Sequence, residues 1–334
     1  MKKFRVAVIG CGAVSKNHGK ALSQNPNTEL SYAVDIDIEK AKSFSSTYGG
    51  EVLTDYRDLY DKNIDCAHIV TPHMTHPQIA IDLMNHGINV FCEKPLAINS
   101  FDALRMIETS EKTGMKLGVC FQNRVNDSTI LAKSIIDSKE YGEIVSAMIL
   151  VAWDRQGDYY SKSPWRGKYE GEGAGCIINQ AIHTIDLLDY LCCGVKIVNG
   201  FTARLRNTND YEVEDTSMAR FILKNGAQAV GFMTNSYPMS KICQLEVHFE
   251  KATMLLDQTR VFIKTSDGQE KDQRFEAAQG YKSEWGLSHG KLIGLFYDSL
   301  ESGKPFICDA KTGVQTIRIV NALQHSNGHE ITIA

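Results

Sequence analysis

One lysine of this chain lies where a ligand-binding residue is expected. Lys94 follows the apolar run 88–92 and stands between Glu93 and Pro95, so it is placed at the end of a strand. In doubly wound α/β sheets, ligands bind at the edge formed by the carboxyl ends of the strands. An amine at that edge can donate a hydrogen bond to a reacting oxygen and stabilise its developing negative charge. Lys94 is therefore a candidate catalytic residue.

A glycine-rich turn near the start of the chain indicates which ligand this is. Gly10 permits a tight turn after an apolar strand, and Gly12 lets a pyrophosphate approach the backbone where a helix begins. The third position of this dinucleotide fingerprint holds Ser15, where Gly or Ala is usual. We expect cofactor contacts from the whole turn: Gly10, Cys11, Gly12, Ala13 and Val14.

An acidic residue at the end of the second predicted strand favours one form of the cofactor. Asp35 can accept hydrogen bonds from the adenosine ribose hydroxyls, and its carboxylate would repel a 2′-phosphate. No arginine lies beside it, although Lys40 is near in sequence. The sequence therefore predicts NAD, with NADP as the alternative that stays open.

A second polar group lies in the other half of the chain. Asn179, His183 and Asp186 have the spacing i, i+4 and i+7, which places them on one face of a helix predicted over 176–192. Histidine, with an ordinary pKa near ~6.5, suits the removal of a hydroxyl proton as a hydride leaves the carbon. His183 is thus the candidate base, and it would return the proton in the reverse reaction. Asp186 would orient a neighbour or serve in packing.

Aromatic and cationic residues between positions 153 and 166 suit a carbohydrate, whose faces stack on rings and whose hydroxyls need fixed partners. The alternative for this loop is a lid or a contact with a neighbouring subunit. Candidate substrate contacts are Asn179, Arg124, Arg155, Tyr159, Trp165 and Arg166, and the family resemblance described below adds His289.

The sequence does not support a metal site, a nucleic-acid-binding surface or a membrane-spanning segment. His68, His73 and His76 are close in sequence, but strand-to-helix geometry points them apart and no acid or cysteine completes a zinc site. The net charge of -4 offers no surface for nucleic acid, and no run approaches the ~20 apolar residues that span a bilayer. Nine scattered cysteines without a Cys-x-x-Cys pair are typical of a reducing cytoplasm.

The elements that must position these residues form two domains of an α/β protein. Residues 1–122 alternate apolar strands with helical patterns, which predicts a Rossmann dinucleotide-binding domain with a parallel sheet. Residues 123–334 carry many β-type runs with hairpin signals at Asn225-Gly226 and Asp267-Gly268. They predict a second α/β domain with a mostly antiparallel sheet. The family resemblance described below implies that this sheet is large and open and that the domain serves substrate binding and oligomerisation.

Several motifs resemble those of the glucose-fructose oxidoreductase/inositol dehydrogenase/MocA (Gfo/Idh/MocA) family. They run in the family's order over nearly the whole chain. The motifs are Gly10-x-Gly12, Thr71-Pro72, His76-Pro77, Glu93-Lys94-Pro95, Trp165-Arg166-Gly167, Glu172-Gly173-Ala174-Gly175 and the segment from Asn179 to Asp186.

This resemblance implies NAD(P)-linked oxidation or reduction of a sugar, cyclitol or related small molecule, by a homodimer or homotetramer built through the second domain's sheet. It implies Lys94 and His183 as the catalytic pair. Asn179 stands where many members carry aspartate, and an amide can bind a hydroxyl but cannot titrate. The residues implied to border the cofactor are Thr71, Pro72, His76, Glu93 and Lys94.

A rival interpretation is a cofactor-sensing regulator of the same fold that binds dinucleotide without turnover. The presence of both Lys94 and His183 argues against it.

Overall fold

The computed structural model describes residues 3–155, 159–206, 210–276 and 288–333, which form two compact units. The first unit comprises residues 1–121 and 288–315, and the second comprises 122–287 and 316–334. The division differs from the predicted one, because a segment near the end of the chain returns to the first unit. There, helix α9 (His289–Ser302) packs against α1 (Ser15–Gln24).

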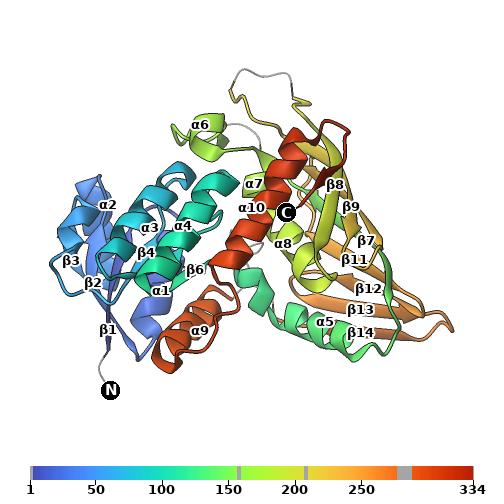
Figure 1. Cartoon of the computed structure of the whole chain (residues 1–334), viewed down its shortest axis with the longest axis horizontal. Coiled ribbons are helices and arrows are strands. Elements are labelled where there is room, and N and C mark those ends of the chain that lie inside the picture. Colours follow the sequence, from blue (N-terminus) through green and yellow to red (C-terminus); the bar gives the residue numbers. More distant parts are fainter. Residues whose placement is uncertain (1–2, 156–158, 207–209, 277–287, 334) are drawn as a thin grey trace. The chain divides into compact units, whose positions relative to one another are not determined.

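The first unit is built on a six-stranded parallel sheet with strand order β3-β2-β1-β4-β5-β6 (Figure 1). Its strands are β1 (Phe4–Ile9), β2 (Thr28–Val34), β3 (Glu51–Leu53), β4 (Cys66–Ile69), β5 (Asn89–Cys92) and β6 (Leu117–Val119). Its other helices are α2 (Ile38–Tyr48), α3 (His76–Asn85), α4 (Ser100–Thr113), and the short 3-10 helices η1 (Tyr56–Leu59) and η2 (His73–Thr75). Strands β1, β4 and β5 are almost wholly buried, as a sheet covered by helices requires.

The register of this sheet brings the predicted cofactor residues to one edge. Ile9 at the end of β1 pairs with Ile69 at the end of β4, and Ile69 pairs with Cys92 at the end of β5. The residues that follow these three strand ends therefore lie side by side. They are the glycine turn, the Thr71-Pro72 segment and the Glu93-Lys94-Pro95 segment.

The second unit contains a nine-stranded sheet with strand order β14-β13-β12-β11-β7-β10-β9-β8-β15 (Figure 1). Only the pair β7 and β10 is parallel among its described strands. The strands are β7 (Ile144–Ala152), β8 (Val195–Ala203), β9 (Thr216–Leu223), β10 (Gln228–Thr234), β11 (Gln244–Phe249), β12 (Ala252–Leu256), β13 (Arg260–Thr265), β14 (Glu270–Arg274) and β15 (Ile331–Thr332). The predicted fold class, a Rossmann domain with a second, mostly antiparallel sheet, is confirmed.

Helices of the second unit pack against this sheet, with α5 contacting β12 and β13 and α8 contacting β7 and β11. The helices and helical turns are η3 (Gln122–Val125), α5 (Asp127–Ser138), α6 (Tyr169–Glu172), α7 (Cys176–Asn179) and α8 (Ile182–Leu191). Helix α10 (Ala310–Ser326) begins in the first unit and ends in the second. In the part of the chain that the structure describes, no helix has the length and apolarity to cross a membrane.

Candidate functional site

The glycine turn between β1 and α1 leaves room above its backbone. Gly10 has φ +93°, and a Cβ there would lie 2.5 Å from the carbonyl oxygen of Val70, so a larger residue is excluded. A Cβ on Gly12 would meet nothing within 4 Å. Helix α1 begins without a side-chain cap, which leaves its first backbone N–H groups available to an anion. The turn therefore fits the pyrophosphate of a dinucleotide.

Asp35 holds the shape of this turn. Its carboxylate accepts hydrogen bonds from the backbone N–H groups of Cys11 and Asp37, each at 2.8 Å. Lys40 pairs with Asp37 at 3.2 Å. Burial, with the nearby charge of Asp35, raises the pKa of the Cys11 thiol to about 12, so this cysteine is a neutral packing residue.

His76 connects the loop after β4 with the loop after β5. Its ring is fully buried, with Nδ1 2.8 Å from the carbonyl oxygen of Pro95 and Nε2 2.9 Å from that of Thr71. Burial lowers the pKa of His76, although both carbonyls act to raise it. Thr71 and Pro72 remain half-buried. His76 thus supports these residues from within, and its direct contact with the cofactor stays a prediction.

Lys94 lies at the same edge, directly after β5, with a half-buried side chain. Its backbone N–H donates to Oε2 of Glu93 at 3.1 Å. Its positive charge contributes to the electrostatics of both Glu93 and His289. The lysine therefore belongs to a cluster of interacting ionisable groups at the end of the sheet.

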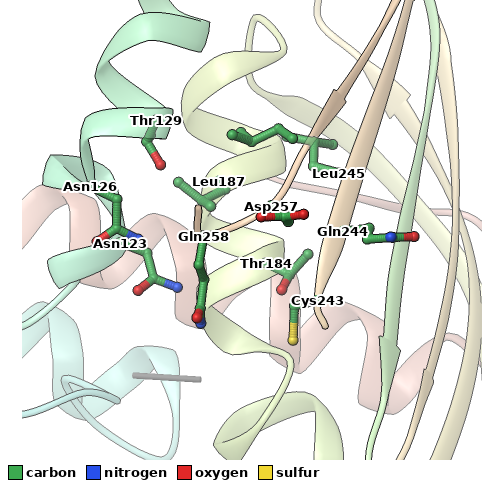
Figure 2. A pocket seen from close by; sticks show the side chains of 11 residues that line it. Asn123, Asn126, Thr129, Thr184, Leu187, Cys243, Gln244, Leu245, Asp257 and Gln258 are labelled. Carbon is green, nitrogen blue, oxygen red and sulfur yellow. The ribbon is translucent and has the colours of Figure 1, made fainter. Parts of the chain in front are cut away.

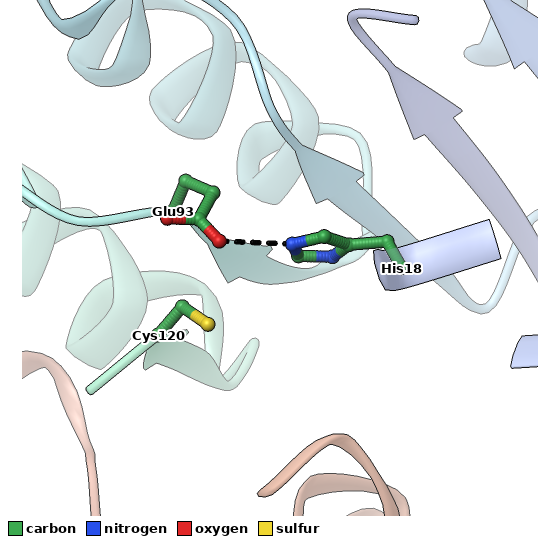
Figure 3. A group of neighbouring side chains, drawn as sticks. All are labelled: His18, Glu93 and Cys120. Carbon is green, nitrogen blue, oxygen red and sulfur yellow. Dashed lines mark hydrogen bonds and ion pairs between the residues drawn. The ribbon is translucent and has the colours of Figure 1, made fainter. Parts of the chain in front are cut away.

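Glu93 is the buried centre of that cluster. Its Oε1 accepts a hydrogen bond from Nε2 of His18 at 3.0 Å, as Figure 3 shows. Burial alone would raise the pKa of Glu93, but the hydrogen bond from His18 and the nearby charge of Lys94 act against burial, and the pKa is held well below its usual range. Glu93 is therefore ionised although only 7% of it is exposed.

The contact between Glu93 and His18 continues to His68 and Tyr297, and the sequence analysis assigned none of His18, His68 and Tyr297 to the site. His18 places Nδ1 2.8 Å from Nδ1 of His68, and Nε2 of His68 lies 2.8 Å from the hydroxyl of Tyr297. All three are fully buried. In the sequence, the signal for His18 is its place on the buried side of α1. A histidine in such a place is more often a core residue than part of a functional site.

A thiol and a further histidine complete the surroundings of Glu93. His18, Glu93 and Cys120 bring one ligand atom each to within 4.8 Å of one another (Figure 3). Burial raises the pKa of Cys120 well above its ordinary value, so it is a neutral thiol in this hydrogen-bonded cluster. His289 lies 4.0 Å from Glu93, and burial lowers its pKa to about 4. The substrate contact predicted for His289 stays a prediction.

In the second unit, the predicted helix 176–192 is two helices, and this part of the sequence analysis is wrong. Asn179 ends α7, and His183 lies in the first turn of α8. Between them the N–H of Ala181 bonds to the carbonyl of Cys176, five residues back, so one extra residue enters the turn. Such bulges shift the register of a helix and are frequent at functional sites. The regular i, i+4 face therefore does not hold across residues 180–181.

Asn179 belongs to a polar network. Its Nδ2 donates to Oε1 of Glu172 and, at 3.3 Å, to the hydroxyl of Tyr159. Gln180 donates to the same hydroxyl at 2.7 Å and accepts from Asn235 at 2.8 Å. Glu172 is 1% exposed, and the sequence analysis did not assign Glu172, Gln180 or Asn235 to the site. The amide of Asn179 is thus fixed in orientation by a carboxylate.

The predicted aromatic and cationic contacts gather around Tyr159. The guanidinium of Arg166 lies 4.6 Å from the ring centre of Tyr159 and 5.3 Å from that of Trp165. Arg155 lies 5.6 Å from Tyr159 and 4.5 Å from Trp153. The structure therefore brings together Arg155, Tyr159, Trp165 and Arg166 near Asn179.

Arg124 and Asp186 form a buried ion pair. The guanidinium donates to both carboxylate oxygens, at 2.8 and 2.9 Å, and the hydroxyl of Thr316 donates to Asp186 at 3.0 Å. Burial raises the pKa of Asp186, against the lowering effect of Arg124 and Thr316. Arg124 also lies 4.3 Å from the ring centre of Tyr190. These contacts hold both side chains inside the second unit, and the substrate contact predicted for Arg124 stays a prediction.

A small hollow lies beside α8 in the second unit (Figure 2). It is lined by Asn123, Asn126, Thr129, Thr184, Leu187, Cys243, Gln244, Leu245, Leu256, Asp257 and Gln258. The buried Oδ1 of Asn123 has no hydrogen-bond partner among the described residues. These lining residues do not include the candidate catalytic residues.

Comparison with known proteins gives a consistent result over most of the chain. Residues 4–121 match the model of an oxidoreductase family with an NAD-binding Rossmann fold. Residues 129–255 match the GFO/IDH/MocA C-terminal domain. The uncharacterized oxidoreductase YrbE of Bacillus subtilis is 26% identical over 97% of this chain and 94% of its own length. Glucose-6-phosphate 3-dehydrogenase of the same organism is 30% identical over 64% of this chain and 60% of its own length.

A solved structure is similar over the full chain. The WlbA dehydrogenase from Bordetella pertussis, in complex with NADH and UDP-GlcNAcA, is 27% identical and superimposes with a TM-score of 0.89. The match covers 100% of this chain and 98% of that one. Levoglucosan dehydrogenase in complex with NADH shares the fold, with a TM-score of 0.89 at 21% identity over the whole of both chains.

Proposed function

The chain belongs to the Gfo/Idh/MocA family of NAD-dependent oxidoreductases, and on that basis we propose that Lys94 and His183 catalyse hydride transfer between a CH–OH carbon and the nicotinamide. The observation that carries this proposal is the place of Lys94, which follows β5 at the edge where the glycine turn also lies. NAD, when bound, supplies the hydride acceptor. The open space at Gly12 and the carboxylate of Asp35 fit its pyrophosphate and ribose.

Each catalytic residue has one task. Lys94 donates an N–H to the reacting oxygen and stabilises the negative charge that develops as hydride leaves the carbon. His183 accepts the hydroxyl proton, and Asn179 binds a neighbouring hydroxyl with its fixed amide. In the reverse direction His183 returns the proton to the oxygen of a carbonyl.

The substrate is a sugar, a cyclitol or a related polyhydroxylated molecule. The ring faces of Tyr159 and Trp165, with the guanidinium groups of Arg155 and Arg166, suit such a ligand. Relatives point to the same chemical class, since they include an inositol 2-dehydrogenase and the WlbA dehydrogenase in complex with UDP-GlcNAcA.

A substrate screen monitored by nicotinamide absorbance tests this function. The panel contains inositols, sugars, sugar phosphates and nucleotide sugars, and it is run in both directions with NAD(H) and NADP(H). We expect turnover of at least one compound, with NAD preferred. Tight NAD binding without turnover over the whole panel would instead favour the cofactor-sensing regulator.

We infer that the open face of the nine-stranded sheet joins subunits of a homodimer or homotetramer. Phe201, Met218 and Phe232 are direct neighbours across β8, β9 and β10, and they are 53%, 57% and 37% exposed. Val230 and Met148 pair in the next strands and are 52% and 40% exposed. Monomeric proteins rarely expose such a contiguous apolar surface.

We infer from its cysteines that the protein resides in the cytoplasm. All nine lie within the described residues, and none of them forms a disulfide. This pattern suits a reducing compartment.

A further inference from the structure

The contacts from Tyr297 to Glu93 form one continuous chain inside the first unit. Tyr297 meets His68 at 2.8 Å, His68 meets His18 at 2.8 Å, and His18 meets Glu93 at 3.0 Å. The three residues behind Glu93 have no exposed surface. They come from α9, β4 and α1, so three separate segments converge on one carboxylate.

Hydrogen-bond chemistry gives this chain a direction. The ionised Glu93 can only accept, so Nε2 of His18 carries a proton. In a neutral His18 the other ring nitrogen accepts, so Nδ1 of His68 donates to it. Nε2 of His68 then accepts from the hydroxyl of Tyr297. Every contact is satisfied with a neutral His68 ring, and burial favours that form, because it lowers the pKa of His68 well below the ordinary value.

The far end of the chain reaches Lys94. Oε1 of Glu93 is taken by His18, while Oε2 accepts the backbone N–H of Lys94 at 3.1 Å. The other titratable or charged groups around Glu93 come from every neighbouring element. They are His68, His76, Cys92, Lys94, Cys120 and His289.

We propose that His18, backed by His68 and Tyr297, is a positioning residue for Lys94: it keeps the Glu93 carboxylate ionised and turned toward the lysine. The anion then favours the protonated ammonium of Lys94, which is the form that can donate to the reacting oxygen. This role rests on the proposed function of Lys94. It assigns a task to three buried side chains that do not touch the substrate.

The charge of Glu93 has a definite effect on the reaction. Without a donor from His18, the buried carboxylate takes up a proton, because burial disfavours its charge. Lys94 then loses a nearby anion and its pKa falls. The alkaline limb of the kcat/KM profile, where Lys94 gives up its proton, moves to lower pH.

The decisive measurement is the titration of Lys94 itself in the full-length protein. The protein is labelled with ¹³Cε-lysine, and the Lys94 signal is assigned as the one missing in Lys94→Arg. We expect Glu93→Gln and His18→Leu each to lower the pKa of Lys94 by about one unit or more, a tenfold change in proton affinity. His18→Gln, which keeps an N–H donor for Glu93, should restore the wild-type titration. His86→Gln, at an exposed histidine after α3, is the matched control.

The remaining variants keep the proposal open to refutation. Tyr297→Phe removes one hydroxyl and should shift Lys94 in the same direction by a smaller amount, and it serves if His18→Leu does not fold. An unchanged Lys94 titration in folded Glu93→Gln would overturn the proposal, as would a shift in His18→Gln equal to that in His18→Leu. NMR titration needs no turnover, so a failure of the proposed dehydrogenase activity would appear separately, as an inactive wild type.

Discussion

Two buried acids, one in each unit, accept hydrogen bonds from different kinds of side chain. The carboxylate of Asp186, in the second unit, accepts two hydrogen bonds from the guanidinium of Arg124 and one from the hydroxyl of Thr316. Glu93 in the first unit is held by the single imidazole N–H of His18, among further histidines. A guanidinium does not lose its proton in proteins, whereas imidazoles do. The Asp186 pair is therefore fixed, while the Glu93 cluster can respond to charge and pH.

We expect the two acids to differ in role, one acting on turnover and the other on stability, and the sequence alone does not distinguish these roles. Both acids belong to motifs that the sequence shows, and both are almost fully buried. Changes to Lys94, at the end of the Glu93 cluster, should affect turnover with little effect on stability, whereas changes to the Arg124–Asp186 pair should affect stability. Variants on each side can break or sharpen this distinction.

The largest effect is expected at the end of the Glu93 cluster. Lys94→Ala should lower kcat about 10³-fold, near 4 kcal/mol, because the oxyanion donor is lost. His183→Ala should lose about 10²- to 10⁴-fold through loss of the base. NAD affinity, measured by calorimetry, and the urea midpoint should stay near the wild type. Turnover close to the wild type in both variants would refute their catalytic roles.

The Arg124–Asp186 pair should affect stability instead. Arg124→Met leaves Asp186 buried without its cation, and this should lower the free energy of unfolding by about 3–5 kcal/mol. Arg105→Met, which removes the cation of the exposed pair with Asp102, is the matched control and should cost about 1 kcal/mol or less. Urea unfolding measures both. Equal losses in the two variants would mean that burial does not distinguish these ion pairs.

The two units should also respond to pH in opposite ways. Burial lowers the pKa of His289 to about 4, so between pH 6.5 and 4 the unfolded state binds more protons and stability is lost as the pH falls. Burial raises the pKa of Glu214 to about 7, so from pH 4.5 to 7 the folded state binds more protons and stability is lost as the pH rises. Each group changes the free energy of unfolding by up to about 3 kcal/mol over its pH range.

Urea unfolding across this pH range tests both signs. His289→Gln should flatten the acid side of the stability curve, and Glu214→Gln should flatten the side between pH 4.5 and 7. If neither slope changes, these two groups do not carry the pH dependence.

The smallest effect on the folded subunit is expected on the open sheet face. Met218→Lys replaces an exposed side chain and should change the free energy of unfolding of a subunit by about 0.5 kcal/mol or less. It should nevertheless shift the assembly toward monomers in analytical ultracentrifugation, because a charge would be buried between subunits. An unaltered sedimentation profile would place the interface elsewhere.

Much of the first unit could be predicted from the sequence because its strands are continuous apolar runs. The apolar run 88–92 predicted a strand that ends just before Glu93, and β5 (Asn89–Cys92) confirms it. Strand β14 was indicated only by the hairpin signal at Asp267-Gly268, because all five of its residues are exposed and polar and no alternation of burial marks it. Strand β3 was not predicted, because it is only three residues long.

The site was predictable only where its residues are neighbours in sequence. Lys94 and the glycine turn follow from strand ends, which local patterns reveal. The contact of His18 with Glu93 joins residues 75 positions apart, and no local pattern reports such a contact. Asp186 was grouped with Asn179 because a regular helix was assumed, and the extra residue near Ala181 breaks that regularity.

The extra residue between α7 and α8 has a consequence for how this site can change over evolutionary time. Each residue of a regular helix advances the side chains by about 100° around its axis. Deleting Ala181 would therefore turn Asn179 relative to His183 in one step, which no single substitution can do. Insertions and deletions at this bulge are thus a discrete route to new substrate preferences, separate from gradual change in the aromatic loop.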